Sequence, residues 1–188
     1  MMSDTQWPRF EVFQQEKQGE PHQNTNSVHA PDPEMALMNA RDVFVRRPDC
    51  YSLWVVPADK IFSKTAQELA GSTWLAAAEA DSALSEVQAA PETYYVFQKL
   101  THQGRQTYAG QVEARTPVEA LRRALETFTT PKALGWWVFP ARWVTRSAPD
   151  DVESMFAPAL DKPFRDQSFY RTVALMHHIK QETRPEEE

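Results

Sequence analysis

The sequence contains an internal repeat, and this repeat constrains the fold more than any other feature. When the chain is shifted by 84 residues, residues 12–14 (VFQ) coincide with residues 96–98. After one deletion the offset becomes 83, and WVVPA at residues 54–58 then meets WVFPA at residues 137–141. Matches at an almost constant offset indicate a tandem duplication, so each copy is expected to fold as one supersecondary unit.

The first copy has the pattern strand, strand, helix, strand. Residues 9–15 (RFEVFQQ) alternate apolar and polar side chains, as a half-buried strand does, and residues 26–30 form a short return strand. Asp32 suits the N-cap and Pro33 the first turn of a helix that ends before Pro48. The aromatic and β-branched run that follows, from 51 to 56, predicts a buried strand.

The second copy repeats this ββαβ order. Its predicted strands span residues 94–100, 108–114 and 135–139, and its predicted helix spans residues 118–128. A single unit of this kind leaves an apolar sheet face or edge uncovered, and two units can cover each other. We therefore predict an α+β fold in which two ββαβ repeats pack as a pseudo-twofold pair, an internal pseudo-dimer within one chain.

The remaining segments set the domain boundaries. The first unit is predicted to occupy residues 1–61 and the second, more diverged unit residues 92–146. The alanine-rich stretch between them favours a helical linker over residues 62–91. Residues 147–188 are predicted to form a helical extension with an acidic tail, which would pack on the double unit or on another protein.

Composition excludes several classes of protein. A net charge of −6 argues against a nucleic-acid binder, which needs a basic surface. No apolar run approaches the roughly 18 residues of a membrane span, and the N-terminus has no signal-peptide pattern. We expect a cytoplasmic protein. The one cysteine, Cys50, allows no disulfide framework, and its place before a buried strand favours an inert thiol.

Motifs for catalysis or cofactor binding are not found. None of the five histidines follows a glutamate by three residues, as helical di-iron sites require, and no nucleotide-binding glycine loop or nucleophile elbow occurs. His22 and His29 are seven residues apart, which matches no standard metal-ligand spacing. We predict no catalytic residue, no metal site and no cofactor, and interpret both histidines as polar surface or interface residues.

Tryptophans and arginines indicate where a partner would bind. Trp54 and Trp137 sit in central strands and favour core packing, whereas Trp7 and Trp143 lie outside them and favour an interface. The first helix carries two charged clusters that the second helix does not place at the same positions. The predicted partner interface comprises Trp7, His22, His29, Arg41, Asp42, Arg46, Arg47 and Trp143.

The first copy resembles a known family. The phrases WPRFEVF, SVHAPDPEMALMNARDVFVRR and SLWVVPADKI, between residues 7 and 61, are similar to the PaaB family, the small B component of the phenylacetyl-CoA 1,2-epoxidase complex. A second histidine and a glycine usually stand in that family where this chain has Asn24 and Asn26. The second copy resembles the family through its fold pattern and its Trp-Val-x-Pro phrase.

The resemblance implies an accessory role in aerobic phenylacetate degradation. It implies a bacterial multicomponent monooxygenase in which a ferritin-like di-iron subunit catalyses epoxidation beside a related metal-free subunit. A reductase with flavin and an iron–sulfur centre supplies the electrons and is a further candidate partner. The B component would be a non-catalytic bridging or assembly subunit.

Two other functions stay open at this point. One is a dimeric α+β enzyme that binds a small molecule between its sheets, and the other is a regulatory or stabilising protein of the same pathway. Because the copies have diverged, we further hypothesise that the tandem chain binds one partner assembly tightly and a second weakly or not at all.

Overall fold

The first unit has the predicted ββαβ order. A computed structural model describes residues 6–45, 50–71, 90–128 and 132–159, together with positions 176 and 179. Asp32 accepts a 2.7 Å hydrogen bond from the Met35 amide and so caps the helix as expected. The helix ends earlier than predicted, because Val45 leaves the helical conformation with a ψ of 67° and places its side chain in the core. The elements are β1 (Arg9–Gln15), β2 (Gln23–His29), α1 (Pro33–Phe44) and β3 (Ser52–Pro57).

The second unit repeats the first in detail. Its elements are β5 (Glu92–Lys99), β6 (Gln106–Ala114), α4 (Pro117–Thr127) and β7 (Gly135–Pro140). Both first strands carry a bulge at the same repeat position, between Val12 and Phe13 in β1 and between Val96 and Phe97 in β5. The α+β class and the two repeats are therefore confirmed.

The two units exchange strands after their prolines. A 3₁₀ turn, η1 (Ala58–Lys60), leads from β3 to β4 (Phe62–Thr65), which pairs with β7 of the second unit. Its equivalent, η2 (Ala141–Trp143), leads from β7 to β8 (Thr145–Arg146), which pairs with β3. Proline is expected to stop sheet pairing because it has no N–H to donate. Pro57 and Pro140 each end their own strand, but the chain then resumes pairing on the other unit.

The segment between the units also differs from the expectation. A helical linker is predicted over residues 62–91, yet this segment begins with strand β4, which covers the edge of β7. The short helix α2 (Ala66–Ala70) follows, and Thr65 and Glu68 form a capping box at its start. The alanine-rich part, residues 72–89, lies outside the described residues.

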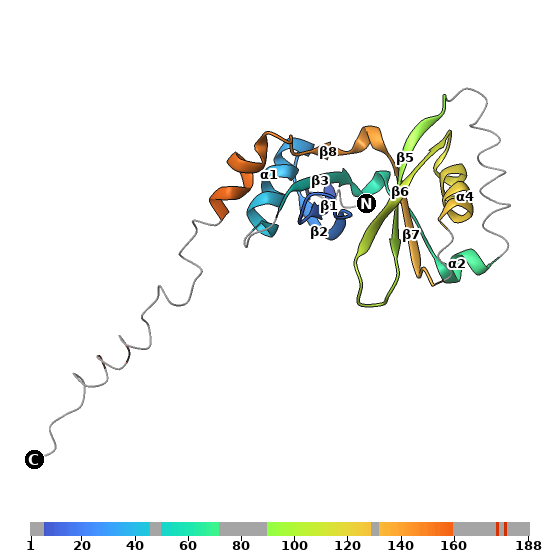
Figure 1. Ribbon diagram of the computed structural model, residues 1–188, viewed down its shortest axis with the longest axis horizontal. Coiled ribbons are helices and arrows are strands. Elements are labelled where there is room, and N and C mark those ends of the chain that lie inside the picture. Colours follow the sequence, from blue (N-terminus) through green and yellow to red (C-terminus); the bar gives the residue numbers. More distant parts are fainter. Residues whose placement is uncertain are drawn as a thin grey trace, which may run out of the picture.

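The helices lie on opposite sides of a central β layer (Figure 1). The strand order is β4-β7-β5-β6-β2-β1-β3-β8. One core lies between α1 and its strands and contains Leu37 and Val55, and a second lies between α4 and its strands and contains Leu121 and Val138. The sheet faces turned away from the helices pack against each other. This third core contains Phe13, Val56, Tyr95, Phe97 and Phe139.

A pseudo-twofold axis follows from residues that contact their own repeat equivalents on antiparallel strands, because a simple translation would leave equivalent strands parallel. Strands β2 and β6 pair at Gln23 and Thr107. The rings of Phe13 and Phe97 lie 4.4 Å apart between centroids. Lys60 Nζ lies 5.1 Å from the centroid of the Trp143 ring. These three contacts relate the two units by a rotation, as predicted for a pseudo-twofold pair.

The described part of the C-terminal extension packs on the first unit. A single π-helical turn, Val152–Phe156, places Phe156 in the core beneath α1. Beyond residue 159 only Met176 and Ile179 are described, and both are exposed. Within the described ranges, no helix is both long and apolar enough to cross a membrane.

Candidate functional site

We call the contact region between the two units the seam; it includes the third core and the strands that are exchanged between the units. A compact cluster around Trp54 lies in this seam. The ring of His22 stacks on Trp54 at 3.8 Å between centroids, and its Nε2 is hydrogen-bonded to Ser52 Oγ at 3.2 Å. Tyr95 stacks on Trp54 at 5.1 Å. Arg146, carried across by the exchanged strand β8, lies 4.9 Å from the centroid of the Trp54 ring and donates to the Tyr95 hydroxyl. The cluster therefore joins both units.

His22 is part of this internal seam and not of an outer surface. Only 7% of the residue is exposed. Burial, and then the Arg146 charge, lowers the pKa of His22 to about 4, so the imidazole is neutral near pH 7. Sequence reasoning places His22 with the predicted partner interface. The structure corrects this expectation, because the turn before β2 directs the side chain onto Trp54.

The space between the strands of the first unit and those of the second is filled by side chains in the part that the structure describes. Phe13, Phe97 and Phe139 pack there with centroid distances between 4.4 and 5.4 Å. Trp54 and Trp137 are half-buried against this core, as expected for tryptophans in central strands. A small molecule bound between the two units would have to displace this packing.

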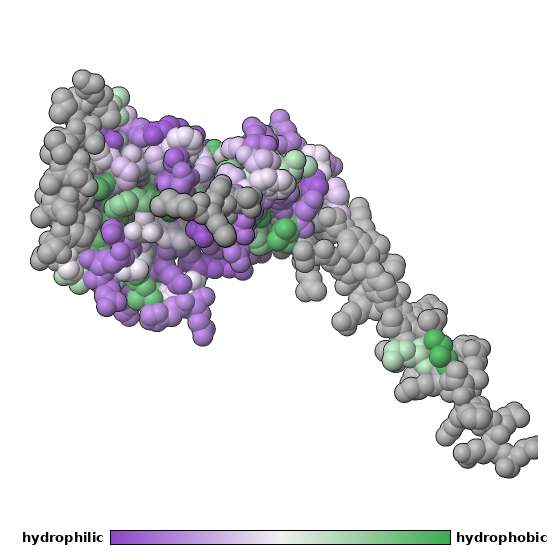
Figure 2. Space-filling model, turned by 180° about the vertical axis from the view of Figure 1, so that it is seen from behind, coloured by the Kyte–Doolittle hydropathy of each residue, from purple (hydrophilic) through white to green (hydrophobic). Residues whose placement is uncertain are grey.

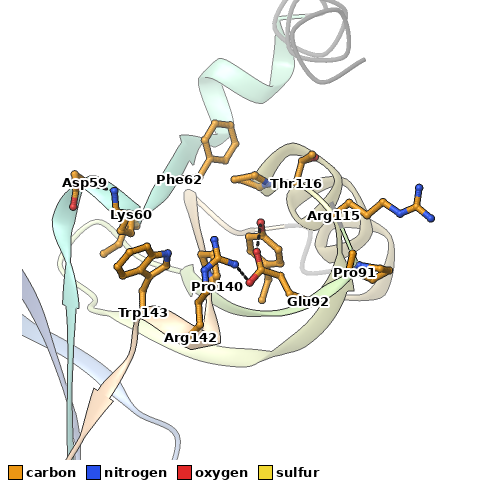
Figure 3. Close-up of a pocket in the computed structure, with 14 residues that line it drawn as sticks. Asp59, Lys60, Phe62, Pro91, Glu92, Arg115, Thr116, Pro140, Arg142 and Trp143 are labelled. Atoms are coloured by element: carbon orange, nitrogen blue, oxygen red, sulfur yellow. Dashed lines mark hydrogen bonds and ion pairs between the residues drawn. The ribbon is translucent and has the colours of Figure 1, made fainter. Parts of the chain in front are cut away.

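An open groove lies at one end of the seam, where the turns η1 and η2 meet (Figure 3). Its volume is about 700 Å³, and Lys60 and Trp143 face each other across its edge. Lys60 is paired with Asp59 at 2.8 Å, and Arg142 is paired with Glu92. These four charges are paired, and Arg115 is a further charged residue of the lining. The aromatic and proline surface of the groove comes from Phe62, Pro91, Tyr94, Pro117, Pro140 and Trp143.

A third feature is an apolar outer face on α1. Met35 is 46% exposed and Met38 is 43% exposed, one helical turn apart, and Val43 is also exposed. Hydrophilic residues cover much of the face of the body shown in Figure 2, and apolar residues are gathered in small patches. Exposed methionines are adaptable contact residues, so this face is suited to bind another protein.

Hydrogen bonds connect this face to the N-terminal segment. His29 Nδ1 donates to the Trp7 carbonyl at 2.8 Å, and Asn39 Nδ2 on α1 donates to the His29 carbonyl at 3.2 Å. The Trp7 side chain is exposed, at 59% for the residue. We call this group of residues, linked by these hydrogen bonds and by helix α1, the Trp7–α1 surface. It comprises Trp7, His29, Met35, Met38, Asn39, Asp42 and Val43.

The predicted interface residues are distributed over three places. Trp7, His29 and Asp42 belong to the Trp7–α1 surface, and Arg41 lies beside it, paired with Asp42 at 2.8 Å. His22 is in the seam and Trp143 is in the groove. Arg46 and Arg47 lie outside the described residues. Sequence reasoning misses Met35 and Met38 as surface residues, although they flank the buried helical stripe of Ala36 and Ala40.

Metal-ligating residues are not grouped in the described part of the chain, where no set of three or more histidine, cysteine, aspartate or glutamate side chains could hold an ion. His22 and His29 lie at opposite ends of β2. Cys50 is buried in the first core, and burial raises the pKa of its thiol to about 12. The thiol is therefore protonated and inaccessible.

Comparisons with known proteins agree with the repeat. A family described as phenylacetic acid degradation B (PaaB) matches the chain twice, over residues 6–86 and 91–177. A curated relative, the B subunit of the 1,2-phenylacetyl-CoA epoxidase of Escherichia coli (strain K12), is 46% identical over 67 residues. That alignment covers 36% of this chain and 70% of the relative. No solved structure matches.

Proposed function

The chain belongs to the PaaB family of phenylacetic acid degradation, and on that premise we propose that it is a non-catalytic bridging or assembly subunit of a phenylacetyl-CoA epoxidase complex. Both repeats match the family, so the chain is a tandem form of the unit that the family describes. The relative is one subunit of an epoxidase, which implies other subunits as partners.

The observation that carries this proposal is the Trp7–α1 surface. It combines an exposed tryptophan with two exposed methionines on a helix that is anchored by its buried face. Tryptophan is enriched at the centres of protein interfaces, and apolar helix faces commonly dock on other helices. We propose that the di-iron catalytic subunit and its metal-free ferritin-like partner contact the chain here, and that the reductase is a further candidate partner.

Copurification tests the proposed function. The full chain, carrying an affinity tag, is co-expressed with the di-iron subunit and its metal-free partner and is then captured from the extract. We expect both oxygenase subunits to be retained through a sizing column at near-physiological salt. Recovery of the tagged chain alone, with both oxygenase subunits folded in the flow-through, would overturn the proposal.

Substitutions in α1 test the surface. The double substitution Met35→Glu/Met38→Arg places the residues of the second unit, Glu119 and Arg122, at the equivalent positions of the first. Because charged groups lose solvation when they are buried without partners, we expect the affinity for the oxygenase subunits to fall about 100-fold or more. Affinity is measured by titration of purified components, and unchanged thermal unfolding establishes that the variant is folded.

The equivalent positions on α4 give a matched control. Arg122→Glu changes an exposed residue at the position that corresponds to Met38. We expect this variant to bind the oxygenase subunits with unchanged affinity. Equal loss of binding in the α1 and α4 variants would contradict an interface on the Trp7–α1 surface.

Arg46 and Arg47 follow shortly after α1 in the chain and belong to the same proposed interface. Arg46→Glu/Arg47→Glu is expected to shift the complex to smaller species on a sizing column, because reversal of two charges removes any electrostatic attraction that they provide to the partner. An unchanged elution profile would remove these two residues from the interface.

A further inference from the structure

The pseudo-twofold repeat provides two helix faces that can be compared position by position. The strand exchange obeys the repeat closely, since Trp54 pairs with Arg146 in the same register in which Trp137 pairs with Ser63. Even a side-chain hydrogen bond recurs: Asn39 donates to the His29 carbonyl, and Arg123 donates to the Glu113 carbonyl at the equivalent place. Backbone geometry is therefore shared, and any difference between the two faces lies in the side chains.

The side chains of the two faces differ in kind. Where α1 exposes Met35 and Met38, α4 carries Glu119 and Arg122, and where the first unit has Val43, the second has Thr127. The neutral Asn39 corresponds to Arg123, which is ion-paired with Glu119. Pro91 stands at the position of Trp7. Every apolar side chain of the Trp7–α1 surface that is large enough to anchor a partner is thus missing from the α4 face.

A partner that fits the first face cannot fit the second equally well. A surface that buries Met35, Met38 and Trp7 must itself be largely apolar at its centre. Against α4 that same surface would remove Arg122 from water without supplying an acidic group, and unpaired buried charge is strongly unfavourable. The charged residues of α4 thus disfavour this partner by an unfavourable interaction, in addition to the loss of favourable apolar contacts.

We infer that this chain binds its oxygenase partner through one helix face only, so that one chain holds one partner assembly. The inference rests on the proposed function and specifies its stoichiometry and the chemistry of the partner surface. A pair of identical units would present two equivalent α1 faces and connect two assemblies. This tandem chain presents one apolar α1 face and one charged α4 face. It therefore binds one partner assembly and does not link two.

The mass of the complex tests the inference directly. The tagged full chain is mixed with a threefold excess of the di-iron subunit and its metal-free partner, and the complex is measured by native mass spectrometry and light scattering. Hydrogen exchange on the same complex reports which helix becomes protected. We expect one partner assembly per chain, with protection of α1 and no added protection of α4.

The outcomes separate the inference from the proposed function. A complex with two partner assemblies per chain, or with protection of both helices, would overturn the single-face inference and leave the assembly function standing. A single assembly bound through α4 would also overturn it. No complex at all would overturn the proposed function and the inference with it. The variant Arg122→Glu/Thr127→Lys should leave the mass and the α1 protection unchanged.

Discussion

At the scale of single residues, the seam shows how the two copies diverged around matching tryptophans. Trp54 is packed between His22 and Tyr95 and faces Arg146. Gln106 and Ser63 stand where the other copy would repeat His22 and Arg146. The contacts of His22 and Arg146 with Trp54 are therefore found in only one half of the seam.

His22 should make stability dependent on pH below neutrality. Its pKa is about 4 in the folded chain against an ordinary value of 6.5, so the unfolded chain binds more protons between these two values. Stability then falls as the pH falls from about 6.5 towards 4, by up to about 3 kcal/mol. Denaturant unfolding at a pH well above 6.5 and at a pH midway between the two values should show about half of this loss.

The variant His22→Gln, which copies Gln106, should remove that part of the loss, even if it lowers stability at every pH. His29→Gln serves as the control because His29 is exposed. An equal pH response in the two variants would show that His22 is not the titrating group.

Gly110 is a position where a side chain does not fit. Its φ of +153° lies in a region that other residues rarely adopt, and an added Cβ would lie 2.5 Å from the ring of Phe128. Gly110→Ala is expected to lower the free energy of unfolding by about 3 kcal/mol, from backbone strain and overpacking. Gly71→Ala, where the nearest atom is 3.5 Å from the added Cβ, should change it by less than about 1 kcal/mol. Similar effects in both would contradict the packing of Phe128 against β6.

At the scale of elements, the exchanged strands hold the two units together. Just after β8, the Ser147 amide donates to the Leu53 carbonyl at 2.9 Å, and Ser147 Oγ accepts a bond from the Leu53 amide at 3.0 Å. Since both groups are buried, Ser147→Ala leaves the Leu53 amide without this acceptor. We expect a loss of about 2 kcal/mol in unfolding free energy. Ser154→Ala, on an exposed turn, should cost less than about 0.5 kcal/mol. A neutral Ser147→Ala would contradict the placement of this strand.

The main elements can be predicted from the sequence, whereas the exchange cannot. Helix α1 is predicted from Asp32, Pro33 and a helical apolar stripe, because capping and periodicity are local signals. Strand β8 has only two residues and β4 only four, too few for a periodic pattern, and their partners are far away in sequence. The prolines before them also suggest an end to pairing. Their role becomes visible only through the tertiary pairing.

The candidate surfaces can be predicted only in part, because some of their residues are indicated by local sequence signals and others depend on tertiary contacts. A tryptophan outside the strands indicates Trp7, since tryptophan favours interfaces, and the neighbouring Arg41 brings Asp42 into the predicted set. His22 is misplaced by sequence reasoning because its burial depends on where Trp54 lies, far along the chain and across the sheet. Met35 and Met38 are apolar residues next to a buried stripe, and sequence alone does not tell which flank of a stripe is covered.

At the scale of the whole molecule, the repeat makes the pairing of two units intramolecular. A tether raises the effective concentration of one unit around the other to about the millimolar range, so the pair persists at any dilution. It also frees the two copies to diverge, which identical subunits cannot do. The charged face of α4 and the apolar face of α1 are the result, and the proposed single docking face depends on both.

The most direct test of this account is the mass of the pure chain in solution. Light scattering is measured over a wide range of concentration, for the wild type and for Met35→Glu/Met38→Arg, in which the exposed apolar face is removed. The account predicts a mass of 21.6 kDa for both proteins, because each unit already has its partner in the same chain. A mass twice as large that persists on dilution in both proteins would contradict the internal pseudo-dimer.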